Sequence, residues 1–253
     1  MNYINLTKET RKTVLSMIYK AQVSHIGSNF SAIDILEVLY SKADFKKDKL
    51  VVSKGWIAAT IYALGVKYQL CPQEAVDAFC DGKSKYIGLI EPLYFWGAEV
   101  AGGSMGLSFS MGVGMARARK SLGKDGIIYI LMSDGEKHCG NIWESARKVV
   151  QEKLDNVIVI IDNNGLCAMG KTDEILKIKP ENLFDGWTIK EINGHDYEQI
   201  ESALSISDRP LAIVANTIKG YPISFMSDNN LYHYKKLDEN EYNLALEELN
   251  GFS

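Results

Sequence analysis

The chain has 253 residues, of which 46% are hydrophobic and 24% are charged, and its formal net charge is −4. This composition excludes a disordered or fibrous chain, and the small acidic excess excludes a broad nucleic-acid-binding surface. No apolar run reaches the roughly 18 residues that a membrane-spanning helix needs. The length is sufficient for one well-packed fold, and we expect residues 1–253 to form a single domain.

The cysteines and the first residues indicate the compartment. Four cysteines occur without the CxxC spacing of a metal or redox motif, namely Cys71, Cys80, Cys139 and Cys167. Charged residues crowd the first dozen positions, so no secretory leader is predicted. We therefore expect free thiols and a cytoplasmic protein.

The first third of the chain predicts two helices and a strand. Residues 5–23 place apolar side chains at helical spacing. Ser31, with Asp34 three residues later, matches a capping box, which predicts that a second helix begins there. The short β-branched run 50–53 is typical of a buried strand, and it leads directly into Lys54.

Glycines then punctuate an Ala-, Met- and Ser-rich stretch over residues 97–114. Glycine disfavours an isolated helix. We therefore expect a closely packed helix, preceded by a loop in which the backbone approaches a ligand. For Gly112 and Gly114, packing alone is the favoured explanation.

Strands and helices alternate in the rest of the chain. Residues 127–132 and 157–161 are continuous apolar runs, which indicate strands covered on both faces. The pattern predicts an α/β fold, a doubly wound, mainly parallel sheet with helices on both faces. The remaining predicted elements are strands at 188–192 and 211–215, helices at 140–153 and 197–205, a loop at 219–237, and a last helix capped by Asp238 and Glu241.

Polar side chains follow two neighbouring predicted strands. Asp134 comes directly after the first run, and Asn164 follows the next one roughly 30 residues later, which is about one strand–helix–strand unit. Ligands of such sheets bind beyond the carboxyl ends of the strands, so both side chains are expected at one crevice. Carboxylate and amide oxygens suit Mg²⁺. By itself the pattern is explained equally well by Asp-Gly and Asn-Gly turns.

These residues are part of an ordered series of motifs that resembles the transketolases, nearly end to end. The segments that resemble the family's thiamine diphosphate motif are Asp134-Gly135-Glu136, Gly140, Trp143-Glu144, Leu154-Asp155-Asn156 and Asp162-x-Asn164. Further similar segments are 24–28, Ser53-Lys54-Gly55, 99–106, Gly194-His195-Asp196, Lys219-Gly220, and Ser224-Phe225-Met226 with His233. In particular, the chain is similar to the N-terminal subunit of split, two-chain transketolases.

The resemblance implies a role for each matching residue. The metal, Mg²⁺ or Ca²⁺, would be bound by the side chains of Asp134 and Asn164 and by the carbonyl of Leu166. The two implied catalytic residues are His25, which would reach the first hydroxyls of the sugar, and His233, which would reach the diphosphate and the reacting centre. Contacts with thiamine diphosphate are implied for Ser28, Lys54, Gly103, Ser104, Met105, Gly135, Asn164, Lys219 and His233.

The chemistry that the resemblance implies is transfer of a two-carbon ketol unit from a ketose to an aldose, carried by the cofactor's thiazolium carbanion. In the family, the cofactor lies between two domain types that different subunits contribute. This chain ends before the pyrimidine-binding domain and its cofactor-activating glutamate. The resemblance thus implies a separate C-terminal subunit, a two-plus-two heterotetramer, and no catalysis by this chain alone.

The sequence departs from the family pattern at the site itself. Trp56 and Leu89 stand where the family has histidines, which implies fewer proton donors and a drier pocket. Our hypothesis is that metal and cofactor binding are retained while the sugar specificity is altered. The other departures are Leu107-Ser108 for Gln-Gly, Ser133 for a glycine, and Cys139 for a glutamate.

Two other functions stay open. One is a related thiamine enzyme that decarboxylates a 2-keto acid and forms a C–C bond. The other is a non-catalytic scaffold subunit, against which the retained Asp134 and Asn164 argue. A nicotinamide-binding domain is disfavoured because no GxGxxG follows the first strand. Of the remaining histidines, His195 is interpreted as structural and His138 as a surface residue.

Overall fold

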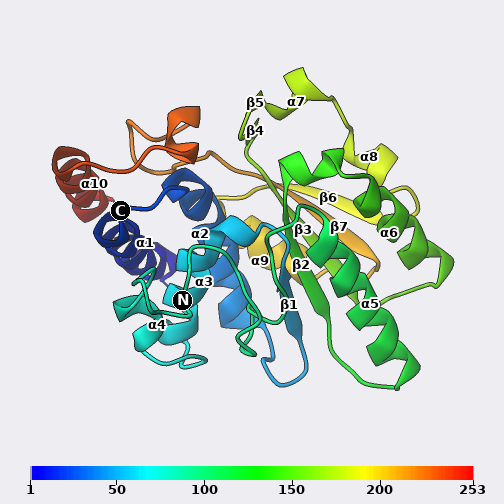
Figure 1. Ribbon diagram of the computed structural model, residues 1–253. Helices are drawn as coiled ribbons and strands as arrows, with labels where there is room; N and C mark the ends of the chain where they lie inside the picture. The colour runs from blue at the N-terminus through cyan, green and yellow to red at the C-terminus, as the bar shows by residue number, and fades with distance from the viewer. Residues whose placement is uncertain (1, 253) are drawn as a thin grey trace.

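A five-stranded parallel sheet forms the centre of the structure, a computed structural model that describes residues 2–252 (Figure 1). Its strands are β1 (Lys49–Val52), β2 (Ile128–Ser133), β3 (Val157–Asn163), β6 (Thr188–Asn193) and β7 (Leu211–Asn216). Their order is β1-β2-β3-β7-β6, so β7 returns between β3 and the edge strand β6. All neighbouring pairs are parallel. The predicted α/β fold is confirmed.

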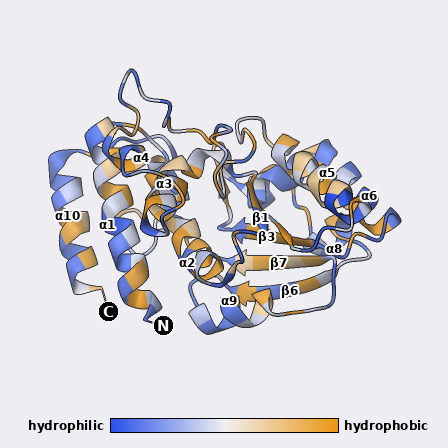
Figure 2. Cartoon of the chain, turned by 90° about the horizontal axis from the view of Figure 1, so that it is seen from below, coloured by the Kyte–Doolittle hydropathy of each residue, from blue (hydrophilic) through white to orange (hydrophobic). Residues whose placement is uncertain are grey.

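Helices cover both faces of this sheet (Figures 1 and 2). One face carries α1 (Tyr3–Ala21), α2 (Ile26–Lys42), α3 (Ala58–Lys67), α4 (Glu74–Asp77), α9 (Tyr197–Leu204) and α10 (Glu239–Gly251). The other face carries α5 (Leu107–Ser121), α6 (Gly140–Gln151) and the short α8 (Pro180–Leu183). A small antiparallel hairpin, β4 (Leu166–Cys167) and β5 (Gly170–Lys171), leads into α7 (Thr172–Ile175).

The central strands supply both hydrophobic cores because their side chains alternate between the two faces. On β2, Tyr129 and Leu131 join the core under α2, while Ile128, Ile130 and Met132 join the core under α5 and α6. The same alternation holds along β3. Each such buried side chain stabilises the fold by about 1.5–3 kcal/mol. This two-sided burial is the reason that the strands have continuous apolar sequences.

The predicted start of the second helix is wrong. The helix α2 begins at Ile26, and Ser31 lies inside it. The Ser31 hydroxyl donates to the carbonyl of Ser28 at 3.2 Å and to the Asp162 carboxylate at 2.7 Å. Asp34 is bonded to Arg11 at 2.6 Å. The spacing that resembles a capping box therefore reflects tertiary contacts.

The glycine-rich stretch forms the expected helix, α5, preceded by a loop over residues 98–106. A Cβ added at Gly112 would lie 2.8 Å from Cδ1 of Ile130, so close packing against β2 accounts for this glycine. A Cβ added at Gly114 would have no neighbouring heavy atom within 4 Å. Packing among residues 2–252 thus does not explain Gly114.

These two glycines give a matched pair of predictions. Gly112→Ala should lower the free energy of unfolding by about 1–2 kcal/mol, since the clash with Ile130 outweighs the gain in helix propensity. Gly114→Ala should raise it by about 0.5–1 kcal/mol, since only the propensity changes. Urea unfolding of the two variants measures both effects. Equal shifts in the same direction would contradict this description of the α5–β2 contact.

The state of the cysteines and the character of the helices were both predicted from the sequence. All four cysteines, each within the described residues, are free thiols, as expected. None of the helices formed by residues 2–252 combines the length and the apolar character needed to cross a membrane.

Candidate active site

A cavity of about 460 Å³ lies beyond the carboxyl ends of β1, β2 and β3. Its walls come from the 3₁₀ turns after β1 (η1, Gly55–Ile57) and β2 (η2, Asp134–His138), from the loop before α5, from the β4–β5 hairpin, and from η3 (Asn230–His233). Most predicted site residues line it: His25, Ser28, Lys54, Gly103, Met105, Asp134, Gly135, Asn164, Leu166 and His233. Two do not: Ser104 is exposed beside it, and Lys219 lies buried behind His233.

The three predicted metal ligands line the same cavity, beyond the ends of β2 and β3. Parallel pairing sets Ser133 opposite Asp162, which places Asp134 beside the turn that contains Asn164. The Asp134 carboxylate accepts the backbone N–H groups of Gly135 at 2.9 Å and Gly165 at 2.6 Å. Its side chain is almost fully buried. The convergence inferred from strand spacing is thus present.

The donor set fits a hard divalent cation that shares its coordination with a ligand. One carboxylate, one amide and one carbonyl leave positions of an octahedral ion open for diphosphate oxygens and water. Among residues 2–252 there is no group of three or more His, Cys, Asp or Glu side chains that could hold a metal ion without such help. A cation at this site would therefore be bound jointly by the chain and by its ligand.

The positive charges near the Asp134 carboxyl do not offset the cost of burying its ionised form. Burial raises its pKa to about 6, and the negative charge of Asp162 adds to the effect. Lys137 and Lys54 act in the opposite direction without cancelling it. A carboxylate that is costly to ionise in the bare chain is one that a divalent cation would stabilise.

Cation binding should consequently depend on pH. Because the Asp134 pKa is raised to about 6, its ionised form destabilises the bare chain fully above that pH, and this effect declines as the pH falls from 6 toward the ordinary Asp value of about 4. A bound cation favours the ionised form, so Mg²⁺ affinity should fall by about tenfold for each pH unit below 6. Calorimetric titrations between pH 5 and 8 measure this. An affinity that does not change across that range would contradict the assignment of Asp134 as a ligand.

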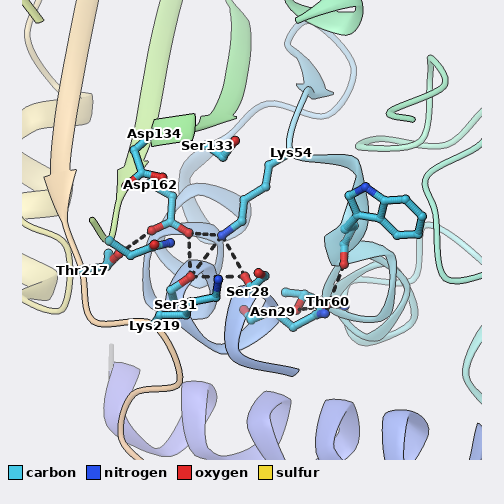
Figure 3. A network of polar contacts seen from close by, with 12 residues as sticks. Ser28, Asn29, Ser31, Lys54, Thr60, Ser133, Asp134, Asp162, Thr217 and Lys219 are labelled. Atoms are coloured by element: carbon cyan, nitrogen blue, oxygen red, sulfur yellow. Dashed lines mark hydrogen bonds and ion pairs between the residues drawn. The ribbon is translucent and has the colours of Figure 1, made fainter. Parts of the chain in front are cut away.

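A buried ion pair lies under the cavity floor (Figure 3). Asp162 is completely buried and accepts hydrogen bonds from Lys54, Ser31 and Thr217. Burial alone would raise the Asp162 pKa, but Lys54 and these hydrogen bonds lower it, so the carboxyl is ionised. The Lys54 ammonium also donates to the Ser28 carbonyl at 2.9 Å and to the Ser31 hydroxyl at 3.1 Å.

Lys54 therefore has its three donors engaged within the chain. Its side chain lines the cavity, as expected for a cofactor contact, but its ammonium ties the end of β1 to α2 and β3. In the chain without a cofactor, the Lys54 ammonium holds the end of β1 against α2 and β3.

Glu136 belongs to the motif found in the sequence, but the sequence reasoning gave it no role of its own. Its buried carboxylate accepts the Ser53 hydroxyl, the Gly106 N–H at 3.0 Å and the Ser133 N–H at 2.7 Å. These bonds join the turns after β1 and β2 to the start of α5. The spacing Ser133-x-x-Glu136 forms a genuine capping box. That spacing is the signal that could have identified it.

The two predicted catalytic histidines lie in contact at the cavity wall. The rings of His25 and His233 meet edge to face with centroids 4.9 Å apart. The backbone N–H of His25 donates to the backbone carbonyl of His233 at 3.1 Å. His25 has φ 72° and ψ 20°, in the left-handed region. Its ring stacks on Trp56 at 4.7 Å. Burial, together with Lys219 and Lys54, lowers the His25 pKa to about 4.

His233 is likewise a neutral base at physiological pH. Burial, Lys219 and His25 lower its pKa to about 3. The Lys219 ammonium donates to Nδ1 of His233 at 2.7 Å, so the ring proton must lie on Nε2. Burial and Lys54 lower the Lys219 pKa to about 8. The pair therefore presents a neutral imidazole with a defined tautomer, next to a cation.

His138 corrects the sequence interpretation. It was expected at the surface, but it is half-buried, lines the cavity and lies with Nε2 2.9 Å from the Leu176 carbonyl. Cys139 lines the cavity beside it, and Cys167 lines it from β4. The structural interpretation of His195 holds, because its buried ring is bonded to Asp34 and to the Ile218 N–H.

Two glycine loops close the side of the cavity. A Cβ at Gly55 would lie 2.0 Å from the Gly102 carbonyl oxygen, so the backbones of the two loops touch. A Cβ at Gly103 would lie 2.9 Å from Cδ2 of Leu89, which places Leu89 directly behind this loop. The close approach found here joins two loops of the chain, and the expected approach of this backbone to a ligand stays a prediction.

Comparison with known proteins places this arrangement in a family. A family model described as transketolase, thiamine diphosphate binding domain, matches residues 4–253. The chain belongs to this transketolase family. This confirms the resemblance found in the motifs of the sequence.

Curated relatives of this transketolase-family chain include proteins named as transketolase subunits. An apulose-4-phosphate transketolase subunit of Phocaeicola vulgatus is 31% identical, over 96% of this chain and 92% of the relative. A 6-deoxy-6-sulfo-D-fructose transketolase subunit of a Clostridium species is 32% identical, over 94% and 93%.

Solved transketolases share the fold. The transketolase of Campylobacter jejuni is 26% identical with a TM-score of 0.89, and the match covers 100% of this chain and 43% of that one. The transketolase of Leishmania mexicana has a TM-score of 0.90 at 22% identity, which supports the fold alone. This transketolase-family chain spans less than half the length of these enzymes.

Proposed function

We propose that the chain is the diphosphate- and Mg²⁺-binding subunit of a thiamine diphosphate-dependent enzyme that transfers a two-carbon ketol unit from a ketose to an aldose. The observation that carries this proposal is that Asp134, Asn164 and Leu166 line one cavity. In addition, burial raises the pKa of the Asp134 carboxyl to about 6. Family membership supports the cofactor. The site lies where ligands of doubly wound sheets bind.

The residues present fit the cofactor. The cation would be held by Asp134, Asn164 and the Leu166 carbonyl. The diphosphate would lie against Gly135 and the 103–105 loop, where a Cβ on Gly135 would crowd Cys167 at 3.1 Å. The nearby polar residues, proposed as further contacts, are Ser28, Ser104, Lys54, Lys219 and His233. Thiamine diphosphate supplies the carbon nucleophile and the electron sink for C–C bond chemistry.

The chain's own residues orient substrate and manage protons. His25 and His233 are neutral, so His25 can donate or accept a hydrogen bond at a sugar hydroxyl, and His233 can donate one. Lys219 fixes the His233 tautomer, which leaves Nε2–H as the donor. Both histidines have low pKa values because they are partly buried and lie near the positive charges of Lys219 and Lys54.

A partner subunit completes the site. Large apolar side chains around the cavity are exposed, with Trp56 at 46%, Met105 at 52%, Tyr234 at 63% and Met169 at 80%. Such an exposed patch marks an interaction surface. The proposed partner carries the pyrimidine-binding domain and the activating glutamate, in a cytoplasmic two-plus-two heterotetramer. The names of the relatives, which describe them as subunits, support this arrangement.

Co-purification with the product of a neighbouring reading frame tests the proposal. The complex is titrated with Mg²⁺ and thiamine diphosphate by calorimetry, and ketose and 2-keto acid donors are then screened. We expect cofactor binding by the complex and ketol transfer from a ketose. Carbon dioxide release from 2-keto acids alone would favour the decarboxylating alternative, and failure to bind cofactor would leave only a scaffold function.

The altered wall of the cavity leads to a prediction about the sugar. Trp56 stacks on His25, and Leu89 lines with it an adjoining cavity of about 390 Å³. The variant Trp56→His/Leu89→His should gain at least about tenfold in kcat/KM toward ordinary sugar phosphates, because two proton donors are restored. Ile87→His, in the same adjoining cavity but outside the main one, is the control. No gain in the double variant would remove the main support for an altered sugar specificity.

A further inference from the structure

The lysine of the site belongs to a backbone segment that is anchored outside the cavity. Lys219 follows β7, and the Ile218 N–H before it donates to Nε2 of His195 at 2.9 Å. After it, the Gly220 N–H donates to the Gly27 carbonyl at 3.1 Å. The Lys219 carbonyl accepts the Asp228 N–H at 2.9 Å. The proposed mechanism assigns no role to His195.

The surroundings of His195 fix its protonation pattern. The ring is 8% exposed as a side chain, and its Nδ1 lies 2.7 Å from Oδ2 of Asp34. Asp34 is completely buried and is paired with Arg11 at 2.6 Å, so it is an ionised acceptor. Nδ1 of His195 must therefore carry a proton and donate it. Nε2 is the acceptor, as the Ile218 N–H requires.

Tyr221 fixes the plane of this ring. Its ring stacks on His195 with centroids 4.0 Å apart and an interplanar angle of 26°. Arg11 donates to the Tyr221 carbonyl at 3.3 Å and therefore contacts both Asp34 and the segment that His195 holds. A series of hydrogen bonds thus connects α1 and α2 to the backbone next to Lys219, and it runs from Arg11 through Asp34 and His195 to Ile218.

We propose that His195 is a positioning residue of the active site: Arg11 and Asp34 orient its imidazole, which holds the backbone at Ile218 and so keeps the Lys219 ammonium on His233. This inference rests on the proposed function, in which Lys219 and His233 face the cofactor. Because Lys219 makes a 2.7 Å bond to Nδ1 of His233, a small displacement of its backbone would lengthen that bond.

The path from His195 to the cavity is tightly packed. A Cβ on Gly27 would lie 3.2 Å from Cγ of Lys219, so α2 confines the lysine side chain on one side. The His233 carbonyl accepts the N–H of His25 at 3.1 Å. A shift of Lys219 would therefore reach both predicted catalytic histidines, although His195 touches neither of them.

Two amide substitutions separate the two hydrogen bonds of His195. In His195→Asn the amide nitrogen can lie near the position of Nδ1 and donate to Asp34, but nothing accepts the Ile218 N–H. In His195→Gln the amide oxygen can lie near the position of Nε2 and accept that N–H. Both variants lose the stacking on Tyr221. The two variants therefore share the same amide group and the same lost stacking, and they differ by one methylene group.

The experiment measures the affinity of the full two-subunit complex for thiamine diphosphate with Mg²⁺, and the ¹⁵N signals of the His233 ring in the full chain without cofactor. His195→Asn should weaken cofactor binding by about tenfold and shift the His233 Nδ1 signal toward that of Lys219→Met, which supplies the reference for a lost lysine contact. His195→Gln should stay within about threefold of the wild type and leave the His233 signal unchanged.

The outcomes are distinguishable from failure of the proposed function. If the wild-type complex binds no thiamine diphosphate, the proposed function fails, while the His233 signals still decide the role of His195. Equal effects of the Asn and Gln variants, in step with equal losses of melting temperature, would overturn the positioning role and leave a purely structural one. An unchanged His233 signal in His195→Asn would overturn it as well.

Discussion

Asp134→Asn should weaken Mg²⁺-dependent binding of thiamine diphosphate by about 100-fold or more while leaving the fold intact. The substitution keeps the shape of the side chain but removes the anionic ligand at the end of β2. In the bare chain the Asp134 carboxylate is costly to ionise, since burial and Asp162 raise its pKa to about 6. Its loss should therefore change the free energy of unfolding by no more than about 1 kcal/mol, the remaining effect coming from the Gly165 N–H, which loses its acceptor.

Calorimetry of the two-subunit complex measures the binding, and urea unfolding of the metal-free chain measures the stability. The matched control is Asp44→Asn, because Asp44 is an exposed carboxylate paired with Lys47 outside the cavity. This control should bind the cofactor like the wild type. Retention of tight cofactor binding by Asp134→Asn would exclude Asp134 as the metal ligand.

The second large effect concerns stability. Arg11→Met should lower the free energy of unfolding by about 3–5 kcal/mol, because it leaves Asp34 ionised and buried without its main partner. Both side chains of this pair are completely inaccessible to solvent. Methionine retains most of the length of the arginine stem, so the loss reports the missing charge rather than a large cavity.

An exposed ion pair provides the comparison. Lys42 and Glu201 are 46% and 43% exposed, so Lys42→Met should lower the free energy of unfolding far less than Arg11→Met does. Burial would raise the Asp34 pKa, but Arg11 and His195 lower it, so the stabilisation by the buried pair is present above pH 4 and is lost as the pH falls through the lower native pKa. The difference between Arg11→Met and the wild type should shrink accordingly in acid. Equal losses in the Arg11 and Lys42 variants would contradict the description of the buried pair.

The sheet could be predicted from the sequence because its physical cause is local. Strands β2 and β3 are buried on both faces, and burial on both faces requires an unbroken apolar run. The position of Asp134 and Asn164 followed from the same pattern, since parallel strands bring their carboxyl ends to one edge. The helix α3 was not predicted. Nearly all of its residues are buried, so it has no polar face to reveal a helical period.

The features of the site that the sequence did not reveal arise from contacts between distant parts of the chain. Ser31 was interpreted as a helix cap, but its hydroxyl bonds to Asp162, 131 residues away. Glu136 was not singled out because two of its partners, Ser53 and Gly106, lie in other loops. Lys54 was expected to contact the cofactor, and only the folded chain reveals that its ammonium has three partners of its own. Such pairings are set by tertiary structure, which spacing along the chain does not record.

One departure from the family pattern, Trp56, changes the surface of the cavity and not the contacts that hold its loops together. The buried pair of Lys54 and Asp162, the carboxylate of Glu136 and the contact between Gly55 and Gly102 do not involve Trp56 or Leu89. Substitution of Trp56 can therefore alter what the cavity accepts without loosening the loops that form it, whereas Leu89 packs behind the Gly103 loop and lines only the adjoining cavity. This separation makes the wall of the cavity a suitable place for a change of substrate.

The left-handed backbone of His25 has a consequence for anyone who engineers this chain. A residue other than glycine at φ 72° costs of the order of 1 kcal/mol, and glycine or asparagine would adopt the same conformation at lower cost. A library selected for heat resistance should therefore replace the histidine, whereas one selected for turnover should keep it. Stabilisation guided by backbone preference would remove one of the two proposed catalytic groups first, so position 25 is best held fixed in any such redesign.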